Sequence, residues 1–207
     1  MSRRPAHGGP ASAGGSCDTA AVPSARERIL EAADRLFYQA GIRAIGVEAV
    51  VERAGVTKMT LYRNFASKDE LVAAYLEVRD RRYWQWWEGV TARHPDRPAA
   101  QILALLAAIA KIAVVEGYRG CPFTNAAIEF PEPGHPGRRV AEAHKREMRR
   151  RFRALAEQAG APEPERLGDQ LSLLAEGAYA SSQSFGANGP APALVSAAEA
   201  LMGLTAP

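Results

Sequence analysis

Apolar residues recur at helical spacing through most of the chain. The first such run has apolar residues at three- and four-residue steps, namely Ile29, Ala33, Leu36, Phe37 and Ala40. This spacing is typical of an amphipathic helix that buries one face. The segment Ser24-Ala-Arg-Glu27 precedes it as a capping box, and Gly41 supplies a stop signal. The pattern therefore predicts a first helix over about 24–40.

Two short runs follow. The apolar residues Val47, Val50, Val51 and Ala54 predict a two-turn helix that ends at Gly55. Thr57 can cap a third helix, in which Leu61 and Phe65 share a face. The polar residues Lys58, Thr60, Arg63 and Asn64 lie off that face. Two short helices joined by a tight turn at a glycine form a helix-turn-helix geometry.

The remaining pattern predicts only further helices. A second capping box, Ser67-Lys-Asp-Glu70, opens a helix that extends to about residue 92. The other expected helices cover about 99–116 with Pro98 as first residue, 122–130, 138–159, 165–186 and 193–203. Three prolines predict an irregular loop over 131–137, and no run alternates as a strand would. We expect an all-α fold.

Composition narrows the class of protein. The 207 residues carry 26 Lys+Arg against 23 Asp+Glu and are 47% apolar, which is typical of a globular chain. The longest apolar run, 102–115, is too short to cross a bilayer, and no apolar stretch follows Arg3 and Arg4 as in a secretion signal. We therefore expect a cytoplasmic protein without a membrane partner. Cys17 and Cys121 are isolated, so neither a disulfide framework, a metal site nor a cofactor is expected.

The polar face of the third helix has the chemistry of a DNA-reading element. Lys58 and Arg63 can reach phosphates or guanine, Thr60 and Asn64 can contact base edges, and Tyr62 can bond a phosphate. The alternative is that any three-helix unit shows a glycine turn and solvated charges, so spacing alone leaves both interpretations open.

The residues themselves match a known pattern. The stretch Ala54-Gly-Val-Thr-Lys-Met-Thr-Leu-Tyr-Arg-Asn-Phe65, followed by Ser67-Lys-Asp-Glu-Leu71, closely resembles the N-terminal domain of the tetracycline-repressor (TetR) family of bacterial regulators. The resemblance covers about 24–72. It implies that the DNA-binding residues are Thr57, Lys58, Met59, Thr60, Tyr62, Arg63 and Asn64 on the recognition helix, and Lys68 at a phosphate. Gly46 and Met59 depart from the family's usual cap residue and glycine, so base preference cannot be copied from a relative.

The resemblance also implies an organisation. It implies a helix-turn-helix DNA-binding domain over 24–70 and a helical ligand-binding and dimerisation domain over 71–207. The composition of residues 1–23, mainly Ala, Gly, Ser and Pro without periodic apolar positions, separately predicts a disordered arm. Family members are dimers that bind palindromic DNA, usually as repressors released by a small effector. One candidate dimer face carries Leu171, Leu174, Ala178 and Ser182 at helical spacing, although the same stripe can instead pack inside the monomer.

Aromatic residues of the C-terminal half favour an apolar or aromatic effector. The candidate effector-binding residues are Trp84, Trp87, Tyr118, Cys121, Phe123, Asn125, His144, Phe152 and Tyr179, with Trp86 as a further aromatic candidate. Aromatic side chains are more often plain core residues. Cys121 is either a redox or electrophile sensor or a small packing residue, and His144 is either a ligand anchor or a satisfied core histidine.

Three other patterns bear on function. The cationic run from Arg138 to Arg153 suggests a solvated face, with recognition of an anion as the alternative. An enzyme is disfavoured, because the only Glu-x-x-His spacing, Glu132 to His135, lies in the proline-rich loop, and neither a nucleophile elbow nor a phosphate-binding glycine loop is present. A plain protein-interaction module would need neither Lys58 nor Lys68.

Overall fold

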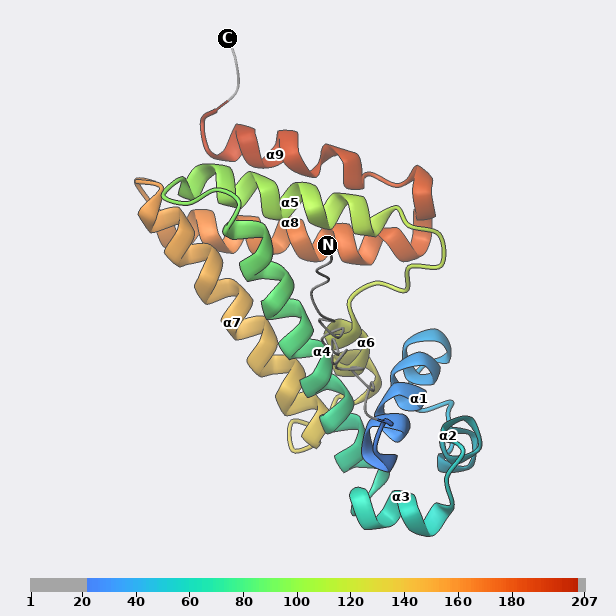
Figure 1. Cartoon of the computed structure of the whole chain (residues 1–207). Coiled ribbons are helices and arrows are strands. Elements are labelled where there is room, and N and C mark those ends of the chain that lie inside the picture. Colours follow the sequence, from blue (N-terminus) through green and yellow to red (C-terminus); the bar gives the residue numbers. More distant parts are fainter. Residues whose placement is uncertain (1–21, 205–207) are drawn as a thin grey trace, which may run out of the picture.

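The structure is a computed structural model that describes residues 22–204 (Figure 1). Within that range the chain forms nine α-helices and two short 3-10 helices, and it contains no strand. The prediction of an all-α fold is therefore confirmed. The expected disordered arm, including Arg3, Arg4 and Cys17, lies almost entirely outside the described residues.

The first three helices form a small unit at one end of the molecule (Figure 1). They are α1 (Ala25–Ala40), α2 (Val47–Ala54) and α3 (Lys58–Asn64). The expected capping box is present, since Ser24 Oγ accepts a hydrogen bond from Glu27 N and Glu27 Oε2 accepts one from Ser24 N. Gly55 adopts a left-handed conformation (φ 62°), which allows the tight turn between α2 and α3. Leu61 and Phe65 are buried and anchor α3 to this unit.

Helix α4 (Lys68–Thr91) connects the small unit to the remaining helices. These are α5 (Pro98–Ala113), α6 (Pro122–Glu129), α7 (Pro136–Gln158), α8 (Pro164–Phe185) and α9 (Leu194–Leu201), with 3-10 turns at Gly186–Asn188 and Ala191–Ala193. Helices α4 and α7 pack along one another, while α5, α8 and α9 gather at the end farthest from α3 (Figure 1). Helix α6 contacts both α4 and α7.

Two local predictions need correction. Helix α7 begins at Pro136, inside the segment expected to be an irregular loop, because proline suits the first helical position and His135 Nδ1 accepts a hydrogen bond from Gly137 N at 3.1 Å. At the start of α4, Ser67 Oγ caps Glu70 N as expected. Glu70, however, accepts from Ala66 N at 2.6 Å, so the reciprocal half of the capping box is displaced by one residue.

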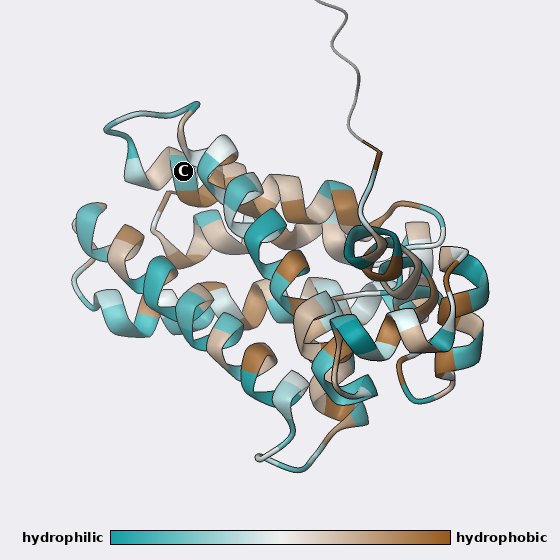
Figure 2. Cartoon of the chain, turned by 60° about the horizontal axis from the view of Figure 1, so that its bottom comes forward, coloured by the Kyte–Doolittle hydropathy of each residue, from teal (hydrophilic) through white to brown (hydrophobic). Residues whose placement is uncertain are grey.

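The core is continuous from the small unit to the far end of the molecule. Hydrophobic and hydrophilic residues alternate along the helices, as expected of amphipathic helices (Figure 2). The backbones of α7 and α8 approach closely at Gly168, where an added Cβ would lie 2.6 Å from Arg153 N. None of the helices within residues 22–204 combines the length and apolar character needed to cross a bilayer.

Candidate nucleic-acid interface and aromatic cavity

Helix α3 presents its polar side to solvent. Thr57 Oγ1 caps the helix by accepting a hydrogen bond from Thr60 N at 3.1 Å. Met59 is 65% exposed and Tyr62 is 45% exposed, and Arg63 is also exposed. Leu61 lies on the opposite face and is fully buried. The side chains of Met59, Tyr62 and Arg63 therefore point to solvent, while Leu61 anchors the helix in the core.

Lys58 is held by a partner that the sequence pattern did not indicate. Its Nζ donates to Glu48 Oε1 at 2.6 Å, across the turn between α2 and α3, and both side chains are exposed. The hydrogen bond raises the pKa of Lys58 and lowers that of Glu48. Because an exposed ion pair of this kind is weak, a nearby phosphate can displace Glu48 and take the ammonium.

Thr60 and Asn64 are less exposed than Met59 and Tyr62. Asn64 Nδ2 donates to Thr60 O at 2.8 Å, and the hydroxyls of Thr57 and Thr60 lie 2.9 Å apart. These bonds fix the orientation of the Asn64 amide, and its Oδ1 makes no hydrogen bond within residues 22–204. An oriented amide is suited to reading a base edge.

Lys68 opens α4 beside the small unit. Its Nζ lies 6.0 Å from the centroid of the Phe37 ring, and burial lowers the pKa of this ammonium. The position combines a cation with the free N–H groups of a helix start, which suits a phosphate. Gly46, at the N-cap of α2, provides no side-chain cap.

A partly open cavity of about 220 Å³ lies mainly between α1, α4, α6 and α8, with Ile112 of α5 and the segment before α6 at its edge. It is lined by Tyr38, Arg79, Arg82, Tyr83, Trp86, Ile112, Tyr118, Gly120, Cys121, Pro122, Phe123 and Tyr179. The structure thus brings together Tyr118, Cys121, Phe123 and Tyr179 from the sequence candidates, and Trp86 with them. The sequence pattern did not single out Arg79, Arg82 or Tyr83.

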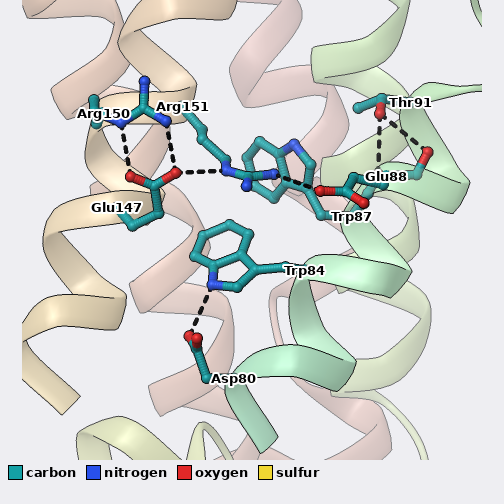
Figure 3. Close-up of polar contacts among 8 residues, drawn as sticks. All are labelled: Asp80, Trp84, Trp87, Glu88, Thr91, Glu147, Arg150 and Arg151. Atoms are coloured by element: carbon teal, nitrogen blue, oxygen red, sulfur yellow. Dashed lines mark hydrogen bonds and ion pairs between the residues drawn. The ribbon is translucent and has the colours of Figure 1, made fainter. Parts of the chain in front are cut away.

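Several other candidates lie instead in a polar layer between α4 and α7 (Figure 3). His144 Nδ1 donates to Asp80 Oδ1 at 2.7 Å, and Trp84 Nε1 donates to the same oxygen at 2.8 Å. The His144 ring stacks on Phe123 with centroids 3.6 Å apart, and burial lowers the pKa of His144 to about 4, against the opposing effect of Asp80. His144 therefore has the surroundings of a neutral, satisfied core histidine.

The remaining candidates are also accounted for. The rings of Trp87 and Phe152 pack edge to face with centroids 4.9 Å apart. Asn125 Nδ2 donates to Arg119 O at 2.8 Å, and Asn125 lines a separate cavity of about 250 Å³ between α1 and α6. Arg151 packs over the Trp84 ring and joins Glu147 to Glu88 across the two helices (Figure 3).

Cys121 lines the cavity and also belongs to a polar cluster with Lys145 and Glu176. Lys145 Nζ donates to Cys121 Sγ at 3.2 Å and also bonds the Glu176 carboxylate. Thr124 Oγ1 donates to the other oxygen of Glu176 at 3.0 Å. Cys121 is 4% exposed, so it is a packed residue with one charged neighbour.

The cationic run on α7 is largely neutralised by acids on α7 and α8. Glu142 pairs with Arg138 and Arg146, Glu147 pairs with Arg150 and Arg151, and Asp169 pairs with Arg149 and Arg153. Such intrahelical and neighbouring pairs are typical of a solvated face.

The candidate dimer stripe packs mainly inside the monomer. Leu171 is fully buried, Ala178 and Ser182 are 5% exposed, and Leu174 is half-buried. The outward side of α8 carries Leu173, which is 71% exposed, together with Gly177 and Ala180. Of the two alternatives left open by the sequence, this burial favours packing within the monomer, since helical spacing shows which residues share a face but not what covers it.

Two sets of contacts join the small unit to the rest of the chain. Glu129 at the end of α6 accepts hydrogen bonds from Ile42 N at 3.0 Å and Arg43 N at 2.7 Å. On α1, Tyr38 Oη donates to Gly120 O at 3.0 Å, and Asp34 pairs with both Arg79 and Arg82 of α4. The α1 helix is thus held by α4 and α6 next to the cavity.

Comparison with known proteins agrees with this geometry. Residues 29–75 match the family model for bacterial regulatory proteins of the tetR family. An HTH-type regulator of Mycobacterium tuberculosis is 43% identical over 58 residues, which is 28% of this chain and only 29% of the relative. The HTH-type transcriptional regulator YjdC of Escherichia coli is 24% identical over 73% of this chain and 80% of its own length.

A solved structure extends the similarity to nearly the whole chain. A TetR-family transcriptional regulator from Streptomyces coelicolor is 32% identical and superposes with a TM-score of 0.82, covering 86% of this chain and 94% of that one. A tetR regulator from Streptomyces avermitilis gives a TM-score of 0.75 at 32% identity, over 88% of this chain and 100% of its own. The chain belongs to the TetR family of DNA-binding transcriptional regulators, which is a family of regulators and not of enzymes.

Proposed function

We propose that this protein is a ligand-responsive repressor that binds a palindromic operator as a homodimer and is released by a small apolar or aromatic effector. The observation that carries the proposal is α3, whose exposed Met59, Tyr62 and Arg63 stand on the buried Leu61. A helix of this kind fits the major groove of duplex DNA. Residues 24–70 would form the DNA-binding domain, and residues 71–207 the effector-binding and dimerisation domain.

The proposed DNA contacts divide into two classes. Lys58, Tyr62 and Lys68 bind phosphates and position the helix, while Arg63 and the oriented Asn64 amide read base edges. Thr57 and Thr60 hold the start of α3, and Thr60 also faces the groove. Met59 contributes an apolar contact, for which a thymine methyl is the natural partner.

A dimer is proposed because one α3 helix can read only half of a palindrome. Two recognition helices bind successive major grooves when they lie about 34–36 Å apart. The outward face of α8, with Leu173, Gly177 and Ala180, is the proposed contact between the two copies. Two-fold symmetry would place the same face of each copy against the other.

The cavity between α1, α4, α6 and α8 is the proposed effector site. Its walls are mainly aromatic, which suits a planar apolar ligand. It touches α1 through Tyr38 and α4 through Tyr83 and Trp86, so a ligand there contacts both the DNA-binding unit and its support. Release from DNA requires the effector to prefer the conformation that does not fit the operator.

Selection of binding sites from random duplex DNA tests the proposal, because the selection itself identifies the operator. The purified full chain is incubated with the library at about physiological salt and the bound fraction is sequenced. We expect an enriched palindrome. Folded protein that enriches no motif, or a motif without two-fold symmetry, would contradict the proposal.

Two substitutions test the division between positioning and reading. Lys68→Ala should weaken binding to all sequences by a similar factor and reduce the salt dependence by about one phosphate contact. Asn64→Ala should instead change the preference among operator variants. Fluorescence anisotropy at several salt concentrations measures both effects, with Lys111→Ala on the exposed side of α5 as the matched control. Uniform losses for both variants would show that Asn64 does not read bases.

A further inference from the structure

Two arginines stand in the lining of the mainly aromatic cavity. Arg79 and Arg82 lie one turn apart on α4, and both line the cavity between α1, α4, α6 and α8. No acidic side chain lines this cavity within residues 22–204. A ligand that enters it therefore meets positive charge on one side and aromatic rings elsewhere.

The two guanidiniums share a single carboxylate. Arg79 Nε donates to Asp34 Oδ1, and Arg82 Nη1 lies 3.5 Å from Asp34 Oδ2. Two positive charges against one negative charge leave the cluster with a surplus of one positive charge. Asp34 is 18% exposed, whereas Arg82 is 62% exposed and free to turn toward a ligand.

Arg79 also retains unused donors. Its guanidinium lies between two phenol rings, 4.5 Å from the centroid of Tyr38 and 5.8 Å from that of Tyr75. Within the described part of the chain its Nη1 and Nη2 make no hydrogen bond, since only Nε bonds Asp34. A planar guanidinium with a free edge is suited to a second carboxylate in a two-point contact.

A third donor lies deeper in the cavity. The hydroxyl of Tyr83 is buried beside that of Tyr179, and it has no other hydrogen-bond partner within the described residues. Burial raises the pKa of both Tyr83 and Tyr118, so each phenol stays protonated and can donate a hydrogen bond. A ligand oxygen that reaches either phenol can therefore accept a hydrogen bond from it.

We propose that the effector is a small aromatic or acyl carboxylate, bound with its carboxylate at Arg79 and Arg82 and its apolar body among Tyr83, Trp86 and Phe123. This inference rests on the proposed function, because it specifies the ligand of the same cavity. The volume of about 220 Å³ is below the roughly 300–1,000 Å³ of pockets for drug-sized ligands. One ring or a short acyl chain is therefore the size that fits.

The same geometry supplies a route to the DNA-binding unit. Asp34 belongs to α1, while Arg79 and Arg82 belong to α4, so their ion pairs join the two helices. A ligand carboxylate can take the free edge of Arg79 while Nε keeps its bond to Asp34, but it competes with Asp34 for Arg82, whose contact with Asp34 is 3.5 Å long. The ligand thus loosens the contact between α1 and α4 when it binds, and the resulting preference for the loosened conformation lowers operator affinity.

Binding of matched acids and amides tests the proposal. Isothermal titration calorimetry compares benzoate, 3-phenylpropionate and octanoate with their uncharged amides, on the full chain. The acids should bind at least about tenfold more tightly than the amides, the typical size of a charge-assisted hydrogen bond. Arg82→Gln should weaken the acids about tenfold and leave the amides unchanged, while Arg81→Gln, on the exposed neighbouring position, should change neither.

Asp34→Asn should change acid binding in the direction opposite to Arg82→Gln. It removes the competing carboxylate, so acids should bind several-fold more tightly while the amides are unaffected. An acid that binds should also lower operator affinity, measured by fluorescence anisotropy on the selected palindrome. A general loss of structure cannot strengthen acid binding, so this variant separates a direct role from misfolding.

The outcomes distinguish this inference from the proposed function. Amides that bind as well as acids, or acids insensitive to Arg82→Gln, would overturn the carboxylate assignment while leaving a neutral effector in place. Failure of every acid to bind at millimolar concentration would also overturn it. Loss of palindrome selection would instead count against the proposed function, because that measurement needs no ligand.

Discussion

Two charged clusters sit side by side on α4 and differ in what they leave unsatisfied. Asp80 faces α7, where it accepts hydrogen bonds from His144 and Trp84. Arg79, the preceding residue, faces α1, where it shares Asp34 with Arg82. The first, the inner cluster, is built around the buried His144 and places two donors on one carboxylate oxygen without surplus positive charge. The second, the outer cluster, has surplus positive charge and unused guanidinium donors. This difference is a reason to assign the inner cluster to stability and the outer cluster to ligand binding.

The largest expected effect comes from removing Asp80, the acid of the inner cluster, which tests whether that cluster stabilises the fold. Asp80→Ala leaves the buried Nδ1–H of His144 without an acceptor and removes the acceptor of Trp84. We expect the free energy of unfolding to fall by about 3–4 kcal/mol, because each lost bond to a carboxylate is worth roughly 1.5–3 kcal/mol. Urea denaturation followed by circular dichroism measures the change.

Asp80→Asn is the matched control for that experiment. It keeps an acceptor oxygen in place and removes the charge, so it should cost less than Asp80→Ala. Equal losses for the two variants would mean that the charge of Asp80, and not its acceptor geometry, stabilises the inner cluster.

The second prediction concerns pH and the same cluster. The pKa of His144 is about 4 in the folded protein, whereas an unfolded histidine has a pKa near 6.5. Between these values the unfolded state takes up a proton that the folded state refuses, so stability falls as pH drops from about 6.5 to 4. Titration of His144 should therefore lower the free energy of unfolding by about 3 kcal/mol by the time the pH reaches 4.

Urea denaturation at intervals from pH 7 to pH 4 checks this dependence against His144→Asn, whose amide can still donate to Asp80. The variant should lose less stability over the same interval. If the free energy of unfolding changes with pH in the same way for the wild-type protein and the variant, His144 does not titrate as proposed.

The smallest expected change in stability comes from the outer cluster, where Asp34 is the acid. Asp34→Asn weakens the link between α1 and α4 and should lower the free energy of unfolding by only about 1 kcal/mol, because asparagine keeps an acceptor oxygen for Arg79 and the pair with Arg82 is solvated. Operator affinity should fall more clearly, since the position of α1 depends on this link. Urea denaturation and anisotropy are compared with Arg150→Ala, which removes an exposed ion pair far from α1 and should change neither. A stability loss as large as that of Asp80→Ala would erase the distinction between the clusters.

The DNA-reading unit was predictable because its signals are local. The apolar spacing of α3, its cap at Thr57 and the turn at Gly55 all act within a few residues, and each appears in the structure as expected. The ion pair of Lys58 with Glu48 was not predicted, although its ten-residue separation crosses only one turn. Spacing within one helix carries no information on a partner in the next.

The cavity was only partly predictable, for a different physical reason. Tyr118, Cys121, Phe123 and Tyr179 were named because aromatic and thiol side chains stand out in a sequence. Arg79 was not, because its role depends on Asp34, 45 residues away. Likewise the stripe through Leu171 showed which residues share a face of α8, but only the packing of the other helices decides which face is covered.

The hydrogen bonds that join α6 to the turn after α1 depend on a side chain at one end and on the backbone at the other. Glu129 supplies both acceptor oxygens, whereas the donors are the backbone N–H groups of residues 42 and 43. Any amino acid except proline retains those donors. Substitutions at the exposed Arg43 would therefore keep both hydrogen bonds, whereas Ile42 is constrained by its burial, and a single change at Glu129 would remove both hydrogen bonds at once.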